Sequence, residues 1–348
     1  MLLAPSLVLP FFSSAQTVED VVTGLTTPST MSVNGSDLYF IQEDANTISK
    51  IDLSQPNPTP VGVVVSGLQL PFGLANDGAH LYFSDEDEGT ISSIHLAVAN
   101  PTPEVVLTVS GKPEALLLDG NTLYFSDLAT GKVSKINLTD ANPTPVVVAI
   151  GLSNPTSLAK SGNRLFIADF NAGMIFKVDV SAPAPMPQVF LTGLDCPGHL
   201  LLEGDNLYFG EFCAGTISKI NIATLDALPV EVATGLSNPT GLAISGSTLY
   251  FGQFGAGKIS KIEGVISDAG EARQSGVSVY PNPASDTLVV ENLTHSAFAR
   301  IVNSAGKVVK TVFVTVDDNW VDTHDLLPGQ YYLQFAAGAS LKFIKSED

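Results

Sequence analysis

Short apolar runs alternate with turn residues through most of the chain. In residues 72–109 these runs are rich in β-branched and aromatic residues, and Gly, Asn, Asp and Pro separate them; they cover 72–75, 81–84, 90–96 and 104–109. Short runs of this composition at regular spacing predict antiparallel strands rather than helices. Asn76-Asp77-Gly78 provides a turn between the first two strands.

The same pattern of apolar and polar positions occurs six times, at a spacing of about 42 residues. Most copies begin with Gly-Leu-x-x-Pro, continue with Leu-Tyr-Phe-x and an acid or amide, and include Gly-x-Ile-Ser-Lys-Ile. A unit of this size cannot bury its own apolar faces, so the copies must pack on one another. Four strands in about 42 residues are typical of a β-propeller blade. The six copies therefore predict an all-β, six-bladed propeller.

The two ends of the repeat region predict how the ring closes. The sixth copy stops after residues 258–262 and lacks a fourth strand. The segment Val-Glu-Asp-Val-Val-Thr-Gly-Leu at 18–25 resembles Val-Glu-Val-Ala-Thr-Gly-Leu at 230–236. We expect the N-terminal segment to form the outer strand of the sixth blade, which leaves no long unpaired edge at the junction. The predicted propeller covers residues 16–264.

The motif Leu-Tyr-Phe-Ser-Asp at 81–85 and 123–127 resembles the Tyr-Trp-Thr-Asp repeats of six-bladed lipoprotein-receptor-type propellers. The whole unit is also similar to the NHL and gluconolactonase-like propellers. The resemblance covers about residues 16–264 and implies the fold. It implies little about function, because these propellers include receptors, lyases and lactonases.

The repeat ends after Ile262, and residues 265–276 are predicted to form a polar linker. Alternating runs such as 287–291 and 311–316 predict a small β-sandwich over 277–348. Ordered landmarks in this region resemble the type A C-terminal sorting domain of the type IX secretion system of Bacteroidetes; they are Tyr280, Pro281, Asn282, Pro283, Gly306, Gly329 and Tyr331. The resemblance implies that the secretion machinery exports the protein and that the tail is then removed, with release or surface attachment. The alternative is an accessory domain that stays attached and helps to bind a ligand.

The N-terminus and the charge balance point to the same compartment. Residues 1–15 are apolar and end in small residues, which predicts a secretory signal peptide cleaved near Ala15, although a basic segment is lacking. No other segment approaches the ~18 uninterrupted apolar residues of a membrane span. The chain has 35 acidic and 16 basic residues, a net charge of −19. This charge disfavours nucleic acids and anionic membranes as partners, and we expect a secreted or outer-surface protein.

An acid or amide ends the Leu-Tyr-Phe-x motif in every copy: Gln42, Asp85, Asp127, Asp169, Glu211 and Gln253. Such a ring suggests a metal site, with the four acids as candidate ligands. A structural role is the favoured interpretation, because a feature present in every blade serves the repeat. In the resembling Tyr-Trp-Thr-Asp family this acid ties neighbouring blades together through hydrogen bonds.

Two residues interrupt the pattern of the innermost strands. Five copies place a small residue at the second position after the proline, and the fifth copy places His199 there. Glu114 stands one position earlier in the third copy, where the other copies have Ser, Phe, Thr, Gly and Thr. His199 and Glu114 are candidates for an acid–base pair or for metal ligands. A hydrogen-bonded filler of a wet channel is the simpler alternative, and we favour it.

The loops after the second strands differ around the predicted ring. The first two copies have Glu43, Asp44, Glu86, Asp87 and Glu88, and the last three have Phe170, Phe212 and Phe254. Carboxylate oxygens suit Ca²⁺, and exposed aromatic rings suit stacking on sugars or peptides. Two alternatives stay open: the phenylalanines pack between blades, or the acids are only solvated.

The two cysteines, Cys196 and Cys213, both fall in the fifth copy and on the same predicted face. In an oxidising compartment this placement predicts a disulfide.

The chain has no Gly-x-Ser-x-Gly elbow, P-loop, His-Glu-x-x-His or dinucleotide motif. We therefore expect a secreted binding protein for a glycan, a peptide or a macromolecule rather than an enzyme. No cofactor is predicted with certainty, and Ca²⁺ is the one considered. The alternatives are a Ca²⁺-dependent hydrolase of the lactonase type, acting through His199 or Glu114, and a structural adhesion module.

Overall fold

The computed structural model describes residues 17–265, except 57, 61, 62, 100, 183, 184, 225 and 226. It also describes residues 278–346, except 292–296, 304–306, 315–318 and 336–339. The predicted signal peptide (1–15) and nearly all of the predicted linker lie outside the described residues. The chain divides into two compact units, one of which is Val18–Ile266 and the other of which contains the described residues from 278 onward.

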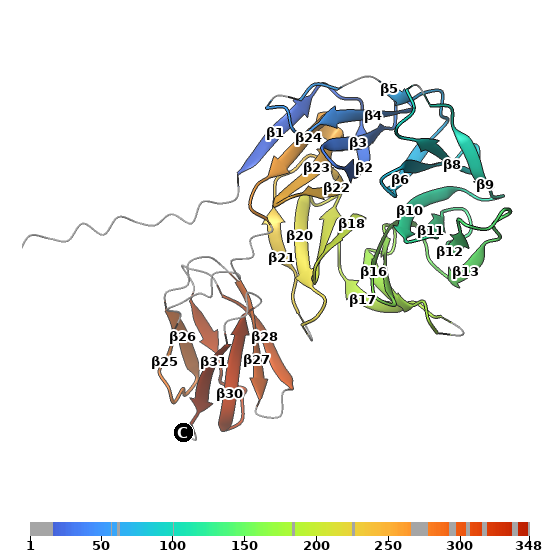
Figure 1. Ribbon diagram of the computed structural model, residues 1–348. Coiled ribbons are helices and arrows are strands. Elements are labelled where there is room, and N and C mark those ends of the chain that lie inside the picture. The colour runs from blue at the N-terminus through green and yellow to red at the C-terminus, as the bar shows by residue number, and fades with distance from the viewer. Residues whose placement is uncertain are drawn as a thin grey trace, which may run out of the picture. The chain divides into compact units, whose positions relative to one another are not determined.

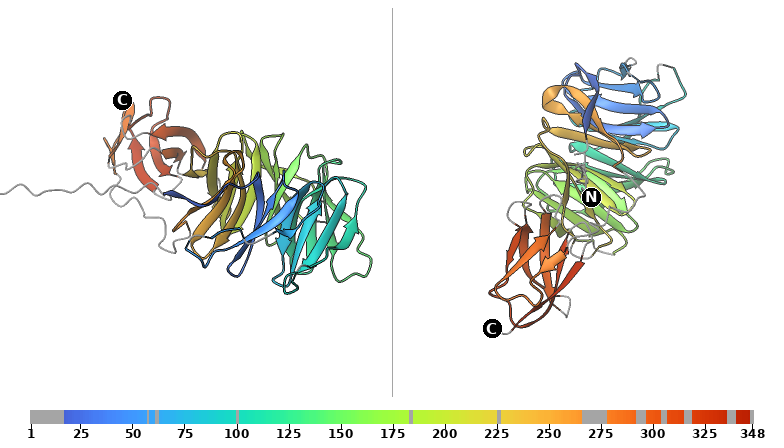
Figure 2. Two further views of the ribbon diagram at one scale, coloured as in Figure 1. Left: turned by 90° about the horizontal axis from the view of Figure 1, so that it is seen from above. Right: turned by 90° about the vertical axis from the view of Figure 1, so that its left-hand side faces the viewer.

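The described part of the first unit forms six four-stranded antiparallel sheets, arranged around a common centre (Figures 1 and 2). The innermost strands are β2 (Pro28–Asn34), β6 (Pro71–Asn76), β10 (Pro113–Asp119), β14 (Pro155–Ser161), β18 (Pro197–Glu203) and β22 (Pro239–Ser245). The second strands are β3 (Asp37–Gln42), β7 (His80–Asp85), β11 (Thr122–Asp127), β15 (Arg164–Asp169), β19 (Asn206–Glu211) and β23 (Thr248–Gln253).

The third strands are β4 (Thr47–Asp52), β8 (Thr90–His95), β12 (Lys132–Asn137), β16 (Met174–Asp179), β20 (Thr216–Asn221) and β24 (Lys258–Ile262). The outer strands are β5 (Val63–Val65), β9 (Glu104–Thr108), β13 (Val146–Ala149), β17 (Gln188–Thr192), β21 (Val230–Ala233) and β1 (Val18–Thr23). A short 3-10 helix, η1 (Phe254–Ala256), follows β23. The strands predicted within 72–109 match β6 to β9 to within a residue or two.

The strand β1 belongs to the same sheet as the last three strands of the first unit. The order in this sheet is β1-β24-β23-β22. β1 runs antiparallel to β24, with Val18 opposite Ile262 and Thr23 opposite Lys258. The other five sheets follow the order of the chain.

Apolar clusters between neighbouring sheets explain why the second strands are apolar on both faces. Leu81 and Phe83 of β7 pack with Tyr39 and Ile48 of the preceding sheet. Tyr82, which lies between them and points to the opposite face, packs with residues of the following sheet. Alternate residues of a strand project from opposite faces, so the continuous Leu-Tyr-Phe run fills two interfaces at once.

The last and first sheets share an apolar cluster in the same way. Val22 of β1 and Ile259 of β24 pack with Met31, Leu38 and Phe40 of the first sheet. Each sheet therefore has a buried apolar interface on both sides, and the last and first sheets share one as well. Such stacking buries the apolar faces that one copy of the repeat cannot bury alone.

A glycine before the third strand allows the loop that connects two consecutive sheets to approach the backbone closely. Gly131 has a φ of +60°, and a Cβ at this position would overlap the carbonyl oxygen of Leu152. The N–H of Leu152 donates to the Gly131 oxygen at 3.1 Å. In the first sheet Asn46 takes this position with a φ of 55°, and asparagine tolerates the left-handed region better than most residues.

The second unit contains two sheets with one shared core. One sheet has the order β25-β26-β29, from β25 (Ser278–Tyr280), β26 (Thr287–Glu291) and β29 (Trp320–Asp322). The other has the order β28-β27-β30-β31, from β27 (Ala297–Asn303), β28 (Val308–Val314), β30 (Gly329–Phe335) and β31 (Ser340–Lys345). Leu288, Ile301, Leu333 and Phe343 are buried between them. No helix among the described residues is long and apolar enough to span a membrane.

Candidate functional site

The residue after each repeated acid or amide occupies an equivalent position in all six sheets. Its N–H donates to the carbonyl oxygen of the residue before the inner-strand proline, at 2.9–3.2 Å. These residues form the rim ring: Glu43, Glu86, Leu128, Phe170, Phe212 and Phe254. Because the same backbone bond fixes each residue, the rim ring lies at the end where the inner strands begin. The rim ring has acidic side chains in the first two sheets and apolar side chains in the other four.

The three phenylalanines of the rim ring form a continuous aromatic row across three sheets. The ring centroids of Phe170 and Phe212 are 5.9 Å apart, and those of Phe212 and Phe254 are 5.8 Å apart. The tilted and edge-on geometries are those that aromatic pairs prefer. All three side chains are only partly buried. The row therefore packs between sheets, as one alternative held, and still presents ring surface at the rim.

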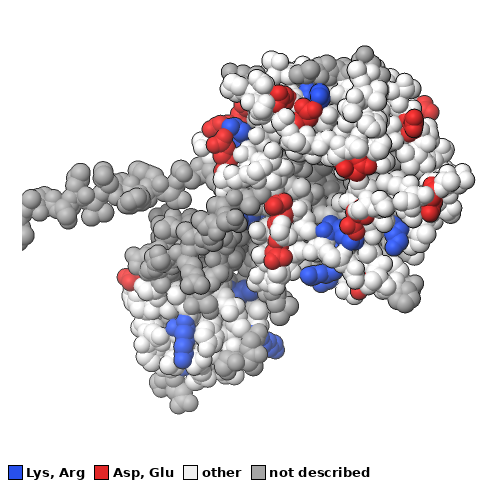
Figure 3. Space-filling view, viewed as in Figure 1, with Lys and Arg blue, Asp and Glu red and all other residues white. Residues whose placement is uncertain are grey.

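The acidic part of the rim ring, Glu43 and Glu86, is largely shielded from solvent. Glu86 is buried, whereas Asp87 and Glu88 beside it are exposed. The Nζ of Lys112 lies 2.9 Å from Asp87 and 4.0 Å from Glu86. Burial, opposed by Lys112 and assisted by Glu43, Asp87 and Asp85, raises the pKa of Glu86 to about 7. On the face seen in Figure 3 the charged side chains form small separate groups among uncharged surface.

Burial acts on Glu43 in the same direction. It raises the pKa of Glu43 to about 7, and the charge of Asp44 adds to the effect. Asp44 itself is exposed, and its N–H donates to the side chain of Thr27 at 2.9 Å. Carboxyl groups with raised pKa values are costly to ionise where they stand.

The repeated acids and amides bind backbone N–H groups of the loop that connects consecutive sheets. Asp169 accepts from Ser153 at 2.7 Å and from Asn154 at 2.9 Å. Equivalent bonds reach Asp85 from residues 69 and 70, Asp127 from 112, Glu211 from 195, Gln42 from 26 and Gln253 from 237. These bonds explain why amides serve as well as acids. The contacts favour the structural interpretation of the ring, and they join the connecting loop to its own sheet.

His199 reaches across the centre of the first unit. Its ring stacks on Phe72 of the second sheet with centroids 6.2 Å apart, although His199 belongs to the fifth sheet. Its Nε2 lies 3.2 Å from the Thr30 hydroxyl of the first sheet. Burial lowers the pKa of His199 to about 4, so the ring is neutral at physiological pH. His199 therefore lies between inner strands, with its Nε2 near Thr30 and its buried Nδ1 without a hydrogen-bond partner among the described residues.

Glu114 is buried on β10 with 3% of its surface exposed. Its Oε2 has no hydrogen-bond partner among the described residues. Burial and the charges of Glu86 and Glu43 raise the pKa of Glu114 well above its usual range. No hydrogen bond or ion pair joins Glu114 to His199 in the described part of the chain, so the two candidates do not form an acid–base pair. The charges that act on Glu114 are instead those of Glu43 and Glu86, the acidic part of the rim ring.

Cys196 and Cys213 form the predicted disulfide, with an S–S distance of 2.01 Å. The bond connects the loop before β18 to the loop after β19. Phe212, next to Cys213, donates its N–H to the Cys196 oxygen at 3.0 Å. The disulfide and this hydrogen bond together hold the middle phenylalanine of the aromatic row.

The sorting-motif residues lie in the second unit, except that Gly306 is outside the described residues. Asn282 accepts from the N–H of Ile344 at 2.9 Å, and so ties the segment of Tyr280, Pro281 and Pro283 to β31. Tyr331, two residues after Gly329 in β30, stacks on Phe343 and donates to the Leu327 oxygen at 2.8 Å. These motif residues fix loops and core of the unit.

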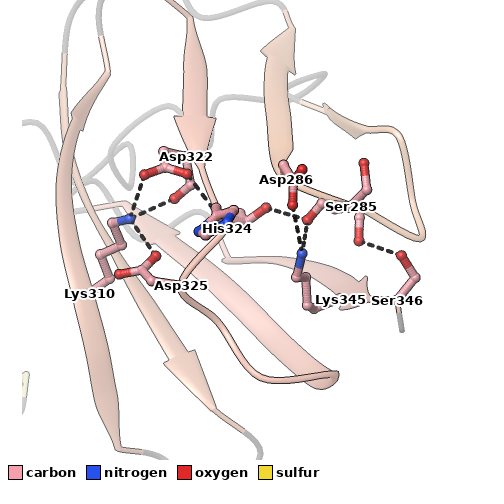
Figure 4. Close-up of polar contacts among 10 residues, drawn as sticks. Ser285, Asp286, Lys310, Asp322, His324, Asp325, Lys345 and Ser346 are labelled. Carbon is pink, nitrogen blue, oxygen red and sulfur yellow. Dashed lines mark hydrogen bonds and ion pairs between the residues drawn. The ribbon is translucent and has the colours of Figure 1, made fainter. Parts of the chain in front are cut away.

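Lysines make the other polar connections of the second unit (Figure 4). Lys310 lies between Asp322 and Asp325, at 3.3 and 2.7 Å. The buried Lys345 contacts the Ser285 oxygen and lies 3.4 Å from Asp286. Both lysines therefore pair with residues of the second unit itself.

Sequence reasoning missed two features of the first unit. It treated Glu43 and Glu86 as members of acidic loops and did not align them with the phenylalanines. It also gave no role to Phe72, which meets His199 from a sheet three places away. The alignment of Glu43 with Phe170 was available from the repeat, but the contact of Phe72 with His199 depends on the tertiary structure.

Residues 278–346 match the family of secretion system C-terminal sorting domains. This family marks proteins that are secreted and attached to the cell surface, and the type IX secretion machinery handles them. No curated protein matches the chain.

Several solved structures share the fold of the chain at low sequence identity. Virginiamycin B lyase from Staphylococcus aureus has 16% identity and a TM-score of 0.55, with 71% of this chain and 98% of that chain covered. A luciferin-regenerating enzyme has 16% identity and a TM-score of 0.59, covering 72% and 95%. A chain of the nidogen/laminin complex has 16% identity and a TM-score of 0.53, covering 79% and 92%. These likenesses show a β-propeller fold. The protein is therefore a secreted, cell-surface protein with a β-propeller and a C-terminal sorting domain.

Proposed function

We propose that this protein is a six-bladed propeller, closed by β1, that binds an extracellular glycan, peptide or macromolecule at its rim ring. The six sheets, the pairing of β1 with β24 and the shared apolar cluster between the last and first sheets support the closed ring. The sorting domain provides export by the type IX system of the kind found in Bacteroidetes. The tail is an address for export rather than part of the binding surface.

The aromatic row is the observation that carries the binding function. Three phenylalanines in mutual contact, each partly exposed, form an apolar platform held by backbone bonds and by the disulfide. Aromatic side chains lose little conformational entropy on binding and bury a large area. Rigid aromatic anchors of this kind dominate the energy of many interfaces.

The geometry supports binding better than metal-assisted hydrolysis. Among the described residues, the one group of three metal-ligating side chains that converge is Asp195, Cys196 and Cys213, and both sulfurs of this group are in the disulfide. The carboxylates of the repeated ring already accept backbone hydrogen bonds. Thermal unfolding with Ca²⁺ and with chelator tests the hydrolase alternative, since Ca²⁺ at a hundredfold excess over its Kd would stabilise the fold by about 2.7 kcal/mol.

Glycan and peptide arrays test the proposed function with the full chain. Phe212→Ala removes both ring contacts of the row, and Phe212→Tyr keeps the ring. Val105→Ala is the matched control, because Val105 is an exposed apolar residue (62%) on the outer strand β9. We expect an array ligand whose binding falls at least tenfold in Phe212→Ala, since a truncated hot-spot residue costs about 2 kcal/mol or more. The tyrosine and valine variants should bind as the wild type does.

Equal binding of the array ligand by Phe212→Ala and the wild type would overturn the assignment of the rim ring. A saturable Ca²⁺ shift combined with turnover of a lactone would replace the binding function by the hydrolase.

A further inference from the structure

The acidic part of the rim ring, Glu43 and Glu86, has more acidic than basic neighbours. The loops that carry the rim ring contain Glu43, Asp44, Glu86, Asp87 and Glu88 and have no Lys or Arg. In the connecting loops beside them, Lys112 is the one basic residue, and it is closer to Asp87 than to Glu86. Glu86 therefore shares Lys112 with Asp87, at the longer distance of 4.0 Å, and Glu43 has no ion pair among the described residues.

Glu114 provides a second, independent observation at the same place. It belongs to the innermost strand β10 rather than to a rim loop, it is 3% exposed, and its Oε2 is unpartnered among the described residues. Ser84, two residues before Glu86, donates its hydroxyl to the Glu114 carbonyl oxygen at 2.6 Å, and Lys112, two residues before Glu114, pairs with Glu86. Glu114 therefore belongs to the same neighbourhood as Glu86. A buried acceptor without a donor destabilises the fold. A ligand that donates hydrogen bonds to Glu114 would remove this cost.

The three carboxyl groups are too far apart to surround one metal ion. Their oxygens do not form a group within 4.8 Å of one another, although all three residues are described. An organic ammonium or guanidinium group is larger and donates several hydrogen bonds in different directions. The spacing therefore suits an organic cation better than a bare ion.

The apolar residues of the rim ring are suited to contact the apolar part of such a cation. Leu128, Phe170, Phe212 and Phe254 follow the two acids around the same ring. Aromatic faces attract cations and also bury apolar groups. The neutral His199 stacked on Phe72 adds no positive charge near the acids.

We propose that the rim ring recognises an organic cation with an aromatic or apolar body. Its ammonium or guanidinium group binds at Glu43, Glu86 and Glu114, and its body lies on the row Phe170, Phe212 and Phe254. This inference rests on the proposed binding function and names the chemical class of the ligand.

Proton release accompanies binding of this kind. Glu43 and Glu86 have pKa values raised to about 7, and burial raises the pKa of Glu114 well above its usual range. The charged groups that face them are Asp44, Asp85, Asp87 and Lys112. A bound cation favours the carboxylate form and so lowers these pKa values. Binding at pH 7 therefore releases protons and becomes tighter as the pH rises from 6 to 8.

Calorimetry of the full chain with three probes tests the inference. The probes are benzylammonium, neutral benzyl alcohol and anionic benzoate, titrated at pH 7 in two buffers of different ionisation enthalpy. We expect benzylammonium to bind at least tenfold more tightly than benzyl alcohol and to release protons to the buffer. Glu114→Gln and Glu86→Gln should each reduce this preference several-fold. Glu104→Gln is the control, because it removes the same charge from an exposed position on the outer strand β9.

The outcomes separate this inference from the proposed function. Equal binding of benzylammonium and benzyl alcohol, both lost in Phe212→Ala, would overturn the cation inference and keep the aromatic rim. No binding of benzylammonium, or binding that Glu114→Gln and Glu86→Gln leave unchanged, would also overturn it, while the array experiment decides the proposed function separately. A loss of preference in Glu104→Gln as large as in Glu114→Gln would show a general charge effect and would overturn the assigned position.

Discussion

Replacing Cys196 and Cys213 by serine should destabilise the first unit and loosen the aromatic row. The disulfide closes a loop with a sequence separation of 17 residues, and it lies in the same pair of loops as Phe212. Without it, the unfolded chain regains the entropy that the cross-link removes. In the folded state, the backbone bond from Phe212 to Cys196 and the bond from the Asp195 N–H to Glu211 still join the two segments.

The magnitude follows from the length of the closed loop. The chain-entropy relation gives about 3 kcal/mol at 25 °C for a loop of about this length. For a unit of this size, each kcal/mol lowers the Tm by roughly 2–4 °C. The double serine variant should therefore unfold about 6–12 °C below the oxidised wild type.

Thermal unfolding of the full chain, with and without reductant, measures this effect. Reductant should lower the Tm of the wild type to that of the variant, and it should leave the variant unchanged. The variant should also bind the array ligand more weakly than the wild type at a temperature where both are folded, because Phe212 is less firmly held.

A variant Tm equal to that of the oxidised wild type would refute the reasoning on loop entropy. A lower Tm with unchanged ligand affinity would refute the link between the disulfide and the aromatic row.

Three further predictions concern single residues of the first unit. The pKa of Glu43 is raised from 4.5 to about 7 in the folded state, so ionisation of Glu43 lowers the stability of the fold as the pH rises through this range. Glu43→Gln should therefore unfold at a higher urea concentration than the wild type at pH 8 but not at pH 4. Equal urea midpoints at pH 8 would contradict this. Gly131→Ala should lower the free energy of unfolding by about 1–3 kcal/mol more than Gly162→Ala, as measured by chemical denaturation. Both glycines have a positive φ, but only at Gly131 would a Cβ overlap Leu152. Equal losses of stability in the two variants would contradict the close approach of Gly131 to Leu152. Asp169→Ala should cost about 2–4 kcal/mol, since it removes the acceptor of three loop N–H groups, those of Ser153, Asn154 and Ala172. A wild-type Tm that depends on Ca²⁺ would contradict the purely structural role.

The repeat made the strands and much of the architecture predictable. Its period of about 42 residues and its alternation of apolar runs with turns do not depend on distant contacts, and the strands within 72–109 were placed to within a residue or two. The disulfide was predictable for a related reason, because Cys196 and Cys213 occupy loops that the repeat assigns to one face. The sorting domain was recognisable from short ordered motifs whose residues fix its loops.

The candidate site was only partly predictable. The phenylalanines of the rim ring were found as departures from the repeat, but their mutual contacts depend on the packing of three sheets. His199 and Glu114, which the sequence offered as a candidate pair, show the limit of such reasoning. Both residues interrupt the same pattern, yet His199 reaches the first and second sheets, and Glu114 is coupled to Glu43 and Glu86.

The sequence by itself determined the repeated unit, its strands, its turns and the export tail, because local spacing and short motifs encode them. The tertiary structure decided which side chains meet around the centre of the propeller. Those contacts join sheets that are far apart in the chain, and burial lowers the pKa of His199 and raises the pKa values of Glu43, Glu86 and Glu114. Neither the contacts across the ring nor the loss of solvent there can be obtained from one copy of the repeat.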